Sequence, residues 1–583
     1  MKKKWLFWID RGGTFTDVLG IDPVGILHSL KLLSENKNNY NDACVEGIRR
    51  ILNVPKNQSF PNEKIEKIRI GTTVGTNALL EKKGASLALF TTAGFEDALE
   101  IAYQNRTNIF ARKIIAKKIL YKKVIGINER VNYKGQVLTP LDIEETTKKL
   151  RLVKNNGFDS LVVVFMHSCS NAQHEQIVKK IAIEEGFKNI TLSHENGNIN
   201  RFISRGQTTL IDAYLTPIIK DYFTSINSLT NDVDIEFIQS HGGLIKGDLF
   251  TGKNSILSGP AGGVVAAAKT AESEQVKKII CFDMGGTSTD VAHYDGRYER
   301  KFENKVDGFD LNVPMMDIHT IAAGGGSIVE FDGIRLTVGP ESAGANPGPA
   351  CYRNDGPLTI TDCNVLLGRI CSEYFPRHFG SNEDKPLSLE DVKTKFEVLK
   401  KQINAKTEQS LSVFEIAEGF IEIAINKMGN AIRKISTDRG HNLKHYSLHS
   451  YGGASGQHAC QVADSIGVKK IIIHREASLL SALGVGLSET RIVREELLNA
   501  NLSIENELFL SRHCEELKQR VVTDLKKQGI CETEQTQNIY ARLKYKGKED
   551  FVEVAAGYCA QMEEDFKARQ KKLYGFIEMD KEI

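Results

Sequence analysis

Two eight-residue segments of this chain repeat one pattern of carboxylates, glycines and hydroxyls. Residues 10–17 read DRGGTFTD and residues 283–290 read DMGGTSTD, and six of the eight positions are identical. Paired glycines let backbone amides approach phosphate oxygens, hydroxyls add donors, and a carboxylate can hold hydrated Mg²⁺. Two such segments would suit a clamp on the phosphates of one nucleotide. A Gly-Gly pair can also serve only as a tight turn.

The expected site residues follow from these two segments. Asp10 and Asp283 are the expected catalytic carboxylates, and each would hold Mg²⁺ through water. The expected phosphate contacts are Gly12, Gly13, Thr14 and Thr16 in the first segment and Gly285, Gly286, Thr287 and Ser288 in the second.

Apolar runs flank both segments and predict the elements that position them. WLFWI precedes the first segment and KKIICF the second, and VLGID and VAHYDG follow them. Short apolar runs interrupted by a glycine turn are typical of two paired strands. Each segment is therefore predicted to form the turn of a β-hairpin.

A third glycine cluster lies at 450–459 and reads SYGGASGQHA. The preceding residues predict a strand and residues 454–466 a helix, so the glycines occupy a strand-to-helix turn. Backbone amides at such a turn could contact an adenosine or a phosphate edge. The expected contacts are Gly452, Gly453, Ala454 and Gly456. The alternative is a loop kept glycine-rich for close packing of the strand and the helix.

Two further features could bind the carboxylate of a substrate. The AAGGGS run at 322–327 offers backbone amides at Gly325, Gly326 and Ser327, unless it is only a packing turn. Arg106 could pair with a carboxylate in bidentate geometry, unless it is a surface arginine.

His167, His174 and Glu175 raise the possibility of a metal site. His174 and Glu175 are expected to begin a helix, where adjacent side chains diverge. A strand-end and helix-start role is the favoured interpretation.

Composition excludes several classes of protein. Lys and Arg total 76 against 74 Asp and Glu, a formal charge of +2, which argues against a nucleic-acid binder or a polybasic membrane-surface protein. No run approaches the roughly 18–20 apolar residues of a membrane span. The ten cysteines form no CxxC pair and no export signal is evident, so we expect a cytoplasmic protein with reduced thiols.

Across these motifs the chain resembles the hydantoinase A/5-oxoprolinase family, within the actin–hexokinase–heat-shock ATPase superfamily. The resemblance implies an α/β fold with two RNase-H-like lobes and ATP between them. From about residue 496 the sequence changes to a charged helix and a short strand, which predicts a small C-terminal α+β unit. In that family the hairpins are phosphate loops one and two and SYGGASG is the adenosine motif. Further matching segments are 68–85, 91–101, 258–267, 315–328, 338–352, 360–370 and 481–489.

The expected division of the chain is a first ATPase lobe at 1–228, a second at 229–495 and a third unit at 496–583. Residues 204–227 and 412–436 predict long helices. In the family the third unit normally continues beyond the sequence EMDKEI, so we expect it to be incomplete.

The resemblance also implies a function, ATP-dependent cleavage of 5-oxo-L-proline to L-glutamate. This chain would use ATP and Mg²⁺ to phosphorylate the lactam, and a hydantoinase B-like subunit or module would complete the hydrolysis. A homo-oligomer is expected. Arg11, between Asp10 and the glycines, favours the 5-oxoprolinase branch. The alternatives are a hydantoinase A-type subunit for N-methylhydantoin, another lactam or a ketone, a non-catalytic nucleotide switch, or an inactive truncated paralogue.

Overall fold

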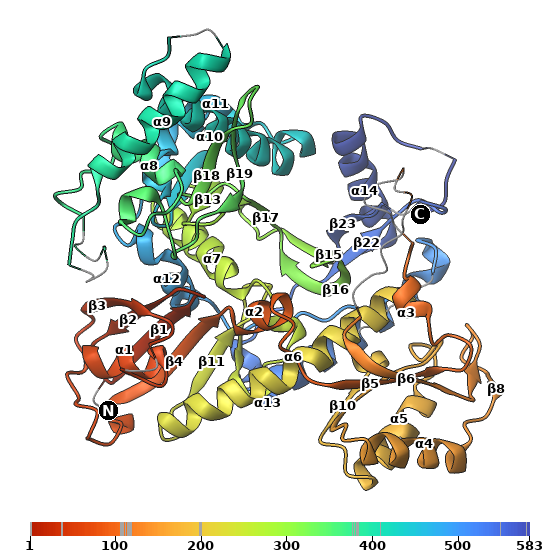
Figure 1. Cartoon of the computed structure of the whole chain (residues 1–583). Coiled ribbons are helices and arrows are strands. Elements are labelled where there is room, and N and C mark those ends of the chain that lie inside the picture. The colour runs from red at the N-terminus through yellow and green to blue at the C-terminus, as the bar shows by residue number, and fades with distance from the viewer. Residues whose placement is uncertain are drawn as a thin grey trace.

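The structure, a computed structural model, describes most of the chain (Figure 1). It covers residues 3–583 except 37–38, 105–109, 111, 113–118, 197–200, 376, 378, 381–383, 408–409, 499, 549 and 579.

The first lobe is built on a six-stranded sheet with the order β12-β11-β4-β1-β2-β3. The first three strands form an antiparallel meander, and β4 and β11 run parallel to β1. Its strands are β1 (Trp5–Arg11), β2 (Phe15–Ile21), β3 (Leu27–Leu33), β4 (Ile65–Thr72), β11 (Ile235–Ile238) and β12 (Leu244–Lys246). Helices α1 (Ala43–Ile51) and α6 (Phe202–Leu229) share a hydrophobic core with this sheet. Helix α6 confirms the helix predicted at 204–227.

The second lobe repeats that topology in a five-stranded sheet with the order β17-β14-β13-β20-β21. Again two strands pair antiparallel on one side of the first strand and two pair parallel on the other. Its strands are β13 (Lys278–Met284), β14 (Thr289–Asp295), β17 (Ile318–Ile321), β20 (Ser447–Tyr451) and β21 (Lys470–Ile472). The repeated strand order confirms the expected duplicated α/β lobes.

One face of the second sheet carries a large hydrophobic core. The helices around it are α8 (Ile360–Leu366), α9 (Leu389–Thr407), α10 (Val413–Ile435) and α11 (Ala459–Ile466). Helix α10 confirms the helix predicted at 412–436. Its apolar positions recur every three or four residues, so one face can be buried along its whole length.

Helices α7 (Ser258–Ser273) and α12 (Leu480–Leu487) join the two lobes and cross each other closely (Figure 1). A Cβ on Gly484 would lie 1.8 Å from the carbonyl oxygen of Gly262. Only glycine permits this approach, because any side chain would collide with the α7 backbone. The same core includes Leu19 of the first sheet and Cys281 of the second.

A separate parallel sheet of order β10-β9-β5-β6 is inserted between β4 and β11. Its elements are β5 (Leu87–Thr92), β6 (Tyr121–Ile127), β9 (Ser160–Val164), β10 (Asn189–Leu192), α4 (Ile143–Asn155) and α5 (Gln173–Glu184). Every residue of β9 is buried, as its continuous apolar sequence predicts.

The boundary predicted at residue 228 requires correction. Strands β11 and β12 follow that residue and yet pair within the first sheet. Such short strands carry little sign of their partner in the sequence, because pairing is decided by tertiary contacts.

The C-terminal unit contains α13 (Glu507–Lys527), β22 (Tyr540–Leu543), β23 (Val552–Ala555) and α14 (Cys559–Tyr574), with a small core of its own. The remaining elements are α2 (Val74–Leu80), α3 (Ala98–Ile101), β7 (Arg130–Val131), β8 (Val137–Thr139), β15 (Arg300–Val306), β16 (Phe309–Met316), β18 (Ser327–Phe331) and β19 (Leu336–Ser342).

Candidate active site

The two repeated segments form equivalent hairpins. Asp10 lies opposite Asp17 across β1 and β2, and Asp283 lies opposite Asp290 across β13 and β14. The first and last carboxylates of each segment are therefore neighbours in the folded chain. The predicted hairpins are confirmed.

Both turns close in the same way. The amide of Gly12 donates to the carbonyl of Phe15 at 3.0 Å, and the amide of Gly285 donates to that of Ser288 at 3.0 Å. Each turn ends in an exposed tip, formed by Gly13 and Thr14 in the first hairpin and by Gly286 and Thr287 in the second. A Cβ on Gly286 would meet no heavy atom within 4 Å, so the space beside that backbone is open.

Burial and neighbouring charges raise the pKa values of the first carboxyl group of each hairpin. Burial, followed by the charge of Asp17, raises the pKa of Asp10 to about 7. Burial, followed by the charges of Asp290 and Asp10, raises the pKa of Asp283 well above its ordinary range. Oδ1 of Asp10 is buried and has no hydrogen-bond partner among the described residues.

Four carboxyl groups gathered in this way are suited to binding a divalent cation. Burial also raises the pKa values of Asp17 and Asp290, so all four carboxylates resist ionisation as they stand. Mg²⁺ prefers carboxylate oxygens and keeps several of its waters. Its charge would offset the repulsion and restore the ionised forms of Asp10 and Asp283.

Glycines from three distant segments surround these carboxylates. Cβ atoms on Gly71 of β4 and Gly259 of α7 would lie 3.1 and 3.2 Å from Oδ1 of Asp10. Gly452 has a φ of +86°, and its Cβ would lie 2.3 Å from Oδ1 of Asp283. The family-type segments at 68–85, 258–267 and 450–459 thus converge on the two hairpins.

The third glycine cluster lies directly beside the second hairpin. The amide of Ala454 donates to the carbonyl of Met284 at 2.9 Å, and that of Gly452 donates to Ala477 at 3.0 Å. Those two amides are therefore engaged within the protein. Cβ atoms on Gly453 and Gly456 would meet nothing within 4 Å, so the open side of this loop lies at these two residues.

Thr16 has a supporting position rather than an exposed one. Its side chain is buried, and its hydroxyl lies 3.0 Å from the Ser34 hydroxyl. Ser34 in turn donates to the carbonyl of Gly12 at 2.7 Å. Thr16 thus helps to fix the shape of the first turn, and its hydroxyl does not lie at the open tip where a phosphate contact was expected.

The AAGGGS run braces the second hairpin. The amide of Gly325 donates to the carbonyl of Gly285 at 3.1 Å, and that of Gly326 to the carbonyl of Gly286 at 2.6 Å. The buried hydroxyl of Ser327 accepts from the amide of Gly324 at 2.8 Å. These contacts favour the packing-turn interpretation over substrate binding. Arg106, the other residue expected to bind substrate, lies outside the described residues.

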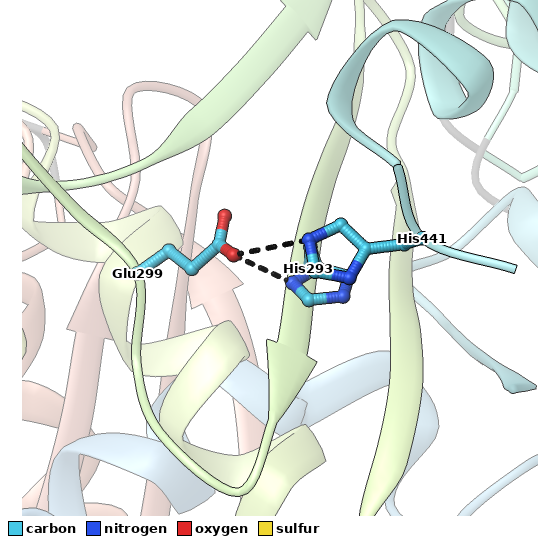
Figure 2. Close-up of side chains that lie close together, drawn as sticks. All are labelled: His293, Glu299 and His441. Atoms are coloured by element: carbon cyan, nitrogen blue, oxygen red, sulfur yellow. Dashed lines mark hydrogen bonds and ion pairs between the residues drawn. The ribbon is translucent and has the colours of Figure 1, made fainter. Parts of the chain in front are cut away.

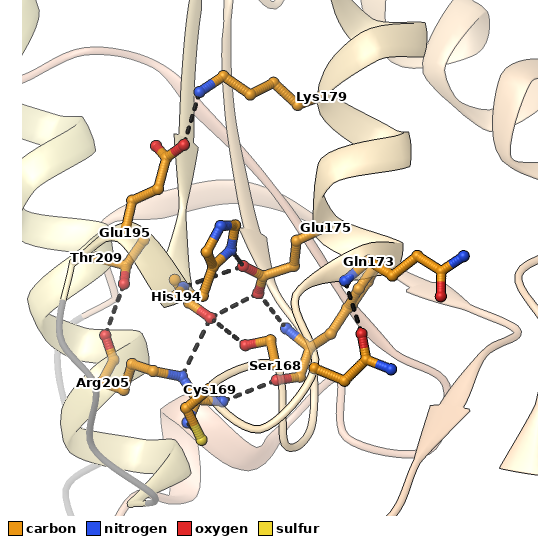
Figure 3. Close-up of polar contacts among 12 residues, drawn as sticks. Ser168, Cys169, Gln173, Glu175, Lys179, His194, Glu195, Arg205 and Thr209 are labelled. Carbon is orange, nitrogen blue, oxygen red and sulfur yellow. Dashed lines mark hydrogen bonds and ion pairs between the residues drawn. The ribbon is translucent and has the colours of Figure 1, made fainter. Parts of the chain in front are cut away.

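His174 and Glu175 begin α5, and their side chains diverge as expected. His174 Nδ1 lies 2.7 Å from Glu129. Glu175 instead accepts from His194 Nδ1 at 2.6 Å (Figure 3). Burial opposes ionisation of Glu175, but hydrogen bonds from His194 and Ser193 lower its pKa overall. The two residues thus belong to separate polar contacts, as a helix-start role requires.

Arg11 points away from the carboxylates. Its guanidinium carbon lies 4.9 Å from the ring centroid of Tyr222 on α6. Successive residues of a strand face opposite sides of a sheet, so Arg11 and Asp10 cannot both face the site. Arg11 therefore contacts α6 on the face of the sheet opposite to Asp10 and does not enter the site.

Four residues near the site were not predicted from the sequence. Asp17 and Asp290 are the last residues of the two repeated segments, so the repeat itself carried the signal. Asn77 Nδ2 lies 3.4 Å from the Cβ position of Gly13, and Ser34 contacts Gly12. Nothing in the sequence pattern marks Ser34, because its role depends on β3 pairing with β2.

No helix in the described part of the chain combines the length and the apolar character that a bilayer span requires.

The chain resembles solved structures over nearly its whole length. An ATP-dependent caprolactamase from Pseudomonas jessenii matches 99% of this chain and 85% of its own, with a TM-score of 0.85 and 27% identity. A nucleotide-free acetone carboxylase matches 98% of this chain and 85% of its own, with a TM-score of 0.71 and 23% identity. The latter likeness concerns the fold alone.

Sequence comparison gives the family. A 5-oxoprolinase of Arabidopsis thaliana is 41% identical, and the match covers 94% of this chain and 46% of the relative. A 5-oxoprolinase of Dictyostelium discoideum is 38% identical, and the match covers 100% of this chain and 50% of the relative. The chain thus spans about half the length of these relatives. Residues 6–186 match the profile of the hydantoinase/oxoprolinase N-terminal region, and residues 205–494 match that of hydantoinase/oxoprolinase. The chain belongs to the hydantoinase/oxoprolinase family.

Proposed function

We propose that this chain binds Mg-ATP between its two hairpins and is the lactam-phosphorylating half of a 5-oxoprolinase. One observation carries the nucleotide part of the proposal. Two equivalent hairpins bring Asp10 and Asp283 close enough for their charges to interact, beside exposed turn tips, and the space next to Gly286 is open. Backbone amides at such tips bind phosphate oxygens, and the carboxylates bind hydrated Mg²⁺.

The roles of the residues follow from this geometry. Asp10 and Asp283 would hold Mg²⁺ through its waters, and the tips at Gly13, Gly286 and Thr287 would hold the phosphates. Phosphoryl transfer demands mainly positioning and neutralisation of charge, which these groups supply. The third glycine cluster at 450–459, called the SYGG loop from here on, is open at Gly453 and would border the adenosine.

A lactam is a poor electrophile because its amide resonance must be broken, and ATP can supply that free energy. The lactam oxygen would attack the γ-phosphorus, and ADP would leave with the electrons of the broken P–O bond. Water would then add to the ring carbon, and the C–N bond would break with its electron pair and a proton going to the nitrogen, which leaves an acyl phosphate. A second water would hydrolyse that acyl phosphate to L-glutamate and phosphate. The second stage belongs to the expected hydantoinase B-like subunit or module.

The relatives support 5-oxo-L-proline as the substrate. Identity is 38–41% to proteins named 5-oxoprolinase, and 29% to the alpha subunit of a caprolactamase. The caprolactamase structure nevertheless matches at a TM-score of 0.85, so a different lactam is the second candidate.

Phosphate release from Mg-ATP tests the proposal. The purified chain is assayed alone and with 5-oxo-L-proline, N-methylhydantoin or ε-caprolactam, each with and without a hydantoinase B-like protein. The proposal is supported if 5-oxo-L-proline stimulates phosphate release and the other two compounds do not. If another compound stimulates release instead, that compound is the substrate. If ATP binds but no compound stimulates release even with the partner, the chain is a nucleotide switch.

The variant Asp283→Asn controls for contaminating ATPase, and Asp221→Asn is the matched substitution at an exposed position of α6. Activity should disappear only in the first variant. Equal activity in both would place the phosphate release outside this site.

A further inference from the structure

Two histidines and a glutamate meet at the end of β14 that lies away from its glycine turn (Figure 2). His293 lies on β14, Glu299 on the connection to β15, and His441 on the connection from α10 to β20. His293 Nδ1 lies 2.9 Å and His441 Nε2 3.8 Å from Oε1 of Glu299. All three donor atoms lie within 4.8 Å of one another.

These distances match the ligand spacing of a tetrahedral metal ion. With metal–ligand bonds of about 2.0–2.1 Å, two ligand atoms of a tetrahedral site lie about 3.3 Å apart. The observed separations of 2.9 and 3.8 Å fall on either side of that value. Two imidazoles and one carboxylate form a donor set that Zn²⁺ and related dications accept, with water in the fourth position.

The surrounding hydrogen bonds leave the required atoms facing one another. The hydroxyl of Tyr446 lies 2.8 Å from His293 Nε2 and 3.2 Å from His441 Nδ1, so each ring turns its other nitrogen toward Glu299. Ligating histidines are commonly oriented through their second nitrogen in this way. Arg439 donates to Oε2 of Glu299 at 3.2 Å, which leaves Oε1 toward the histidines.

The positive charge of Arg439 is balanced locally. Its guanidinium also donates to Asp317 at 2.6 Å, and that carboxylate pairs with Lys301 at 2.8 Å. Arg439 therefore belongs to a chain of ion pairs and is not an isolated cation beside the three ligands. The His293 side chain is buried, whereas those of Glu299 and His441 are 24% and 17% exposed, which gives an ion a route from solvent.

We propose that His293, Glu299 and His441 form a binding site for a transition-metal dication of the Zn²⁺ type. The site is distinct from the proposed magnesium site. His293 is three residues along β14 from Asp290, about 10 Å at the rise of a strand. The ion would join the hairpin strand β14 to the segment that leads into β20, whose end carries the SYGG loop. It would thus brace the two elements that border the proposed nucleotide site.

The site is tested by metal content. The full chain is treated with EDTA, desalted, dialysed against Zn²⁺ or Co²⁺ and analysed for metal per chain. The wild type is expected to hold one equivalent more than Glu299→Gln and His441→Gln. His445→Gln is the matched control, because His445 is exposed and four residues from His441. Equal metal content in wild type and both site variants would overturn the proposal.

Two further readouts separate this site from other ligands. Cysteine thiolates elsewhere in the chain could also bind the metal, but a thiolate on Co²⁺ adds a charge-transfer band that a His₂Glu site lacks. Zn²⁺ should also raise the Tm of the wild type and of His445→Gln, because binding to the folded state alone stabilises it. If the Co²⁺ protein shows a thiolate band and the two site variants bind as much metal as the wild type, the metal is bound by cysteine.

Tyr446→Phe tests the positioning role of the hydroxyl. The ring stays in the core, so folding should survive, while Zn²⁺ affinity falls by roughly tenfold or more because the orientation of His293 is lost. Unchanged affinity would show that Tyr446 does not orient the ligands and would contradict the arrangement proposed here.

Discussion

Gly452 lies directly against Asp283. A Cβ on this glycine would stand 2.3 Å from Oδ1 of the aspartate and 2.6 Å from the carbonyl oxygen of Met284, and the residue has a φ of +86°. Position 452 thus requires glycine both for its backbone conformation and for the space beside a site carboxylate. The SYGG loop and the second hairpin therefore cannot shift independently.

Gly452→Ala is expected to destabilise the protein and to weaken nucleotide binding. The added methyl group must displace the Asp283 carboxylate or the loop, and alanine is strained at positive φ. We expect a loss of about 1–3 kcal/mol in the free energy of unfolding, measured by urea denaturation.

Gly453→Ala is its control, because a Cβ there meets nothing within 4 Å. That variant should unfold at nearly the wild-type urea concentration. Equal destabilisation of the two variants would argue against a specific contact at Gly452.

Asp283→Asn should abolish turnover of Mg-ATP and yet stabilise the protein without ligand at pH 8. Burial, followed by the charges of Asp290 and Asp10, raises the pKa of Asp283, so folding is opposed at pH 8 by the cost of burying this ionisable group. An amide cannot ionise and avoids that cost. Phosphate release and Tm measure the two effects. Near-normal turnover would remove Asp283 from the site, and a lowered Tm would contradict the electrostatic account.

Mg²⁺ should stabilise the protein more at pH 8 than at pH 5. The pKa of Asp10 is about 7 in the folded chain against an ordinary value of 3.8, so the folded state binds more protons between these values. The free energy of unfolding therefore falls as pH rises through this window, by up to about 4 kcal/mol. Mg²⁺ replaces the proton and should restore stability at high pH.

The measurement is the rise in Tm on adding Mg²⁺, at both pH values, in wild type and Asp10→Asn. The variant should show a smaller rise at pH 8. A rise in the wild type that does not depend on pH would mean that Mg²⁺ does not bind at Asp10.

Gly286→Val is expected to weaken ATP binding at least tenfold without unfolding the chain. The side chain would enter the open space beside the turn, where no protein atom lies within 4 Å, and would exclude a phosphate. Gly557→Val is the same substitution at another glycine with open space around it. Calorimetric titration with Mg²⁺ and a non-hydrolysable ATP analogue compares the two variants. Equal affinities would show that the turn tip at Gly286 does not contact the phosphates.

The sequence predicted the parts of the fold that depend on local pattern. The two repeated segments at 10–17 and 283–290 predicted both hairpins, because the paired strands around each glycine turn are neighbours in the sequence. The long apolar periodicities predicted α6 and α10 to within two residues at each end. The glycines and carboxylates of the sequence also located two parts of the candidate site, the repeated segments and the SYGG loop.

Several relationships could not be predicted because they join segments distant in sequence. Strand β11 pairs with β4 although residues 73–234 intervene, so the first lobe passes the predicted boundary at 228. The bonds from Gly325 and Gly326 to the second hairpin depend on β17 pairing with β14. No spacing rule relates Glu299 to His441, which meet only because β14 and β20 flank the same strand.

The sequence by itself determined the chemistry of the chain: two carboxylate–glycine–hydroxyl hairpins and a glycine loop, each specified by neighbouring residues. The tertiary structure alone decided which of these groups face open space and which support others. Thr16 became a buried partner of Ser34, and the AAGGGS amides became braces. The physical reason is that a polar group's role depends on what occupies the space around it, and the packing of distant elements sets that space.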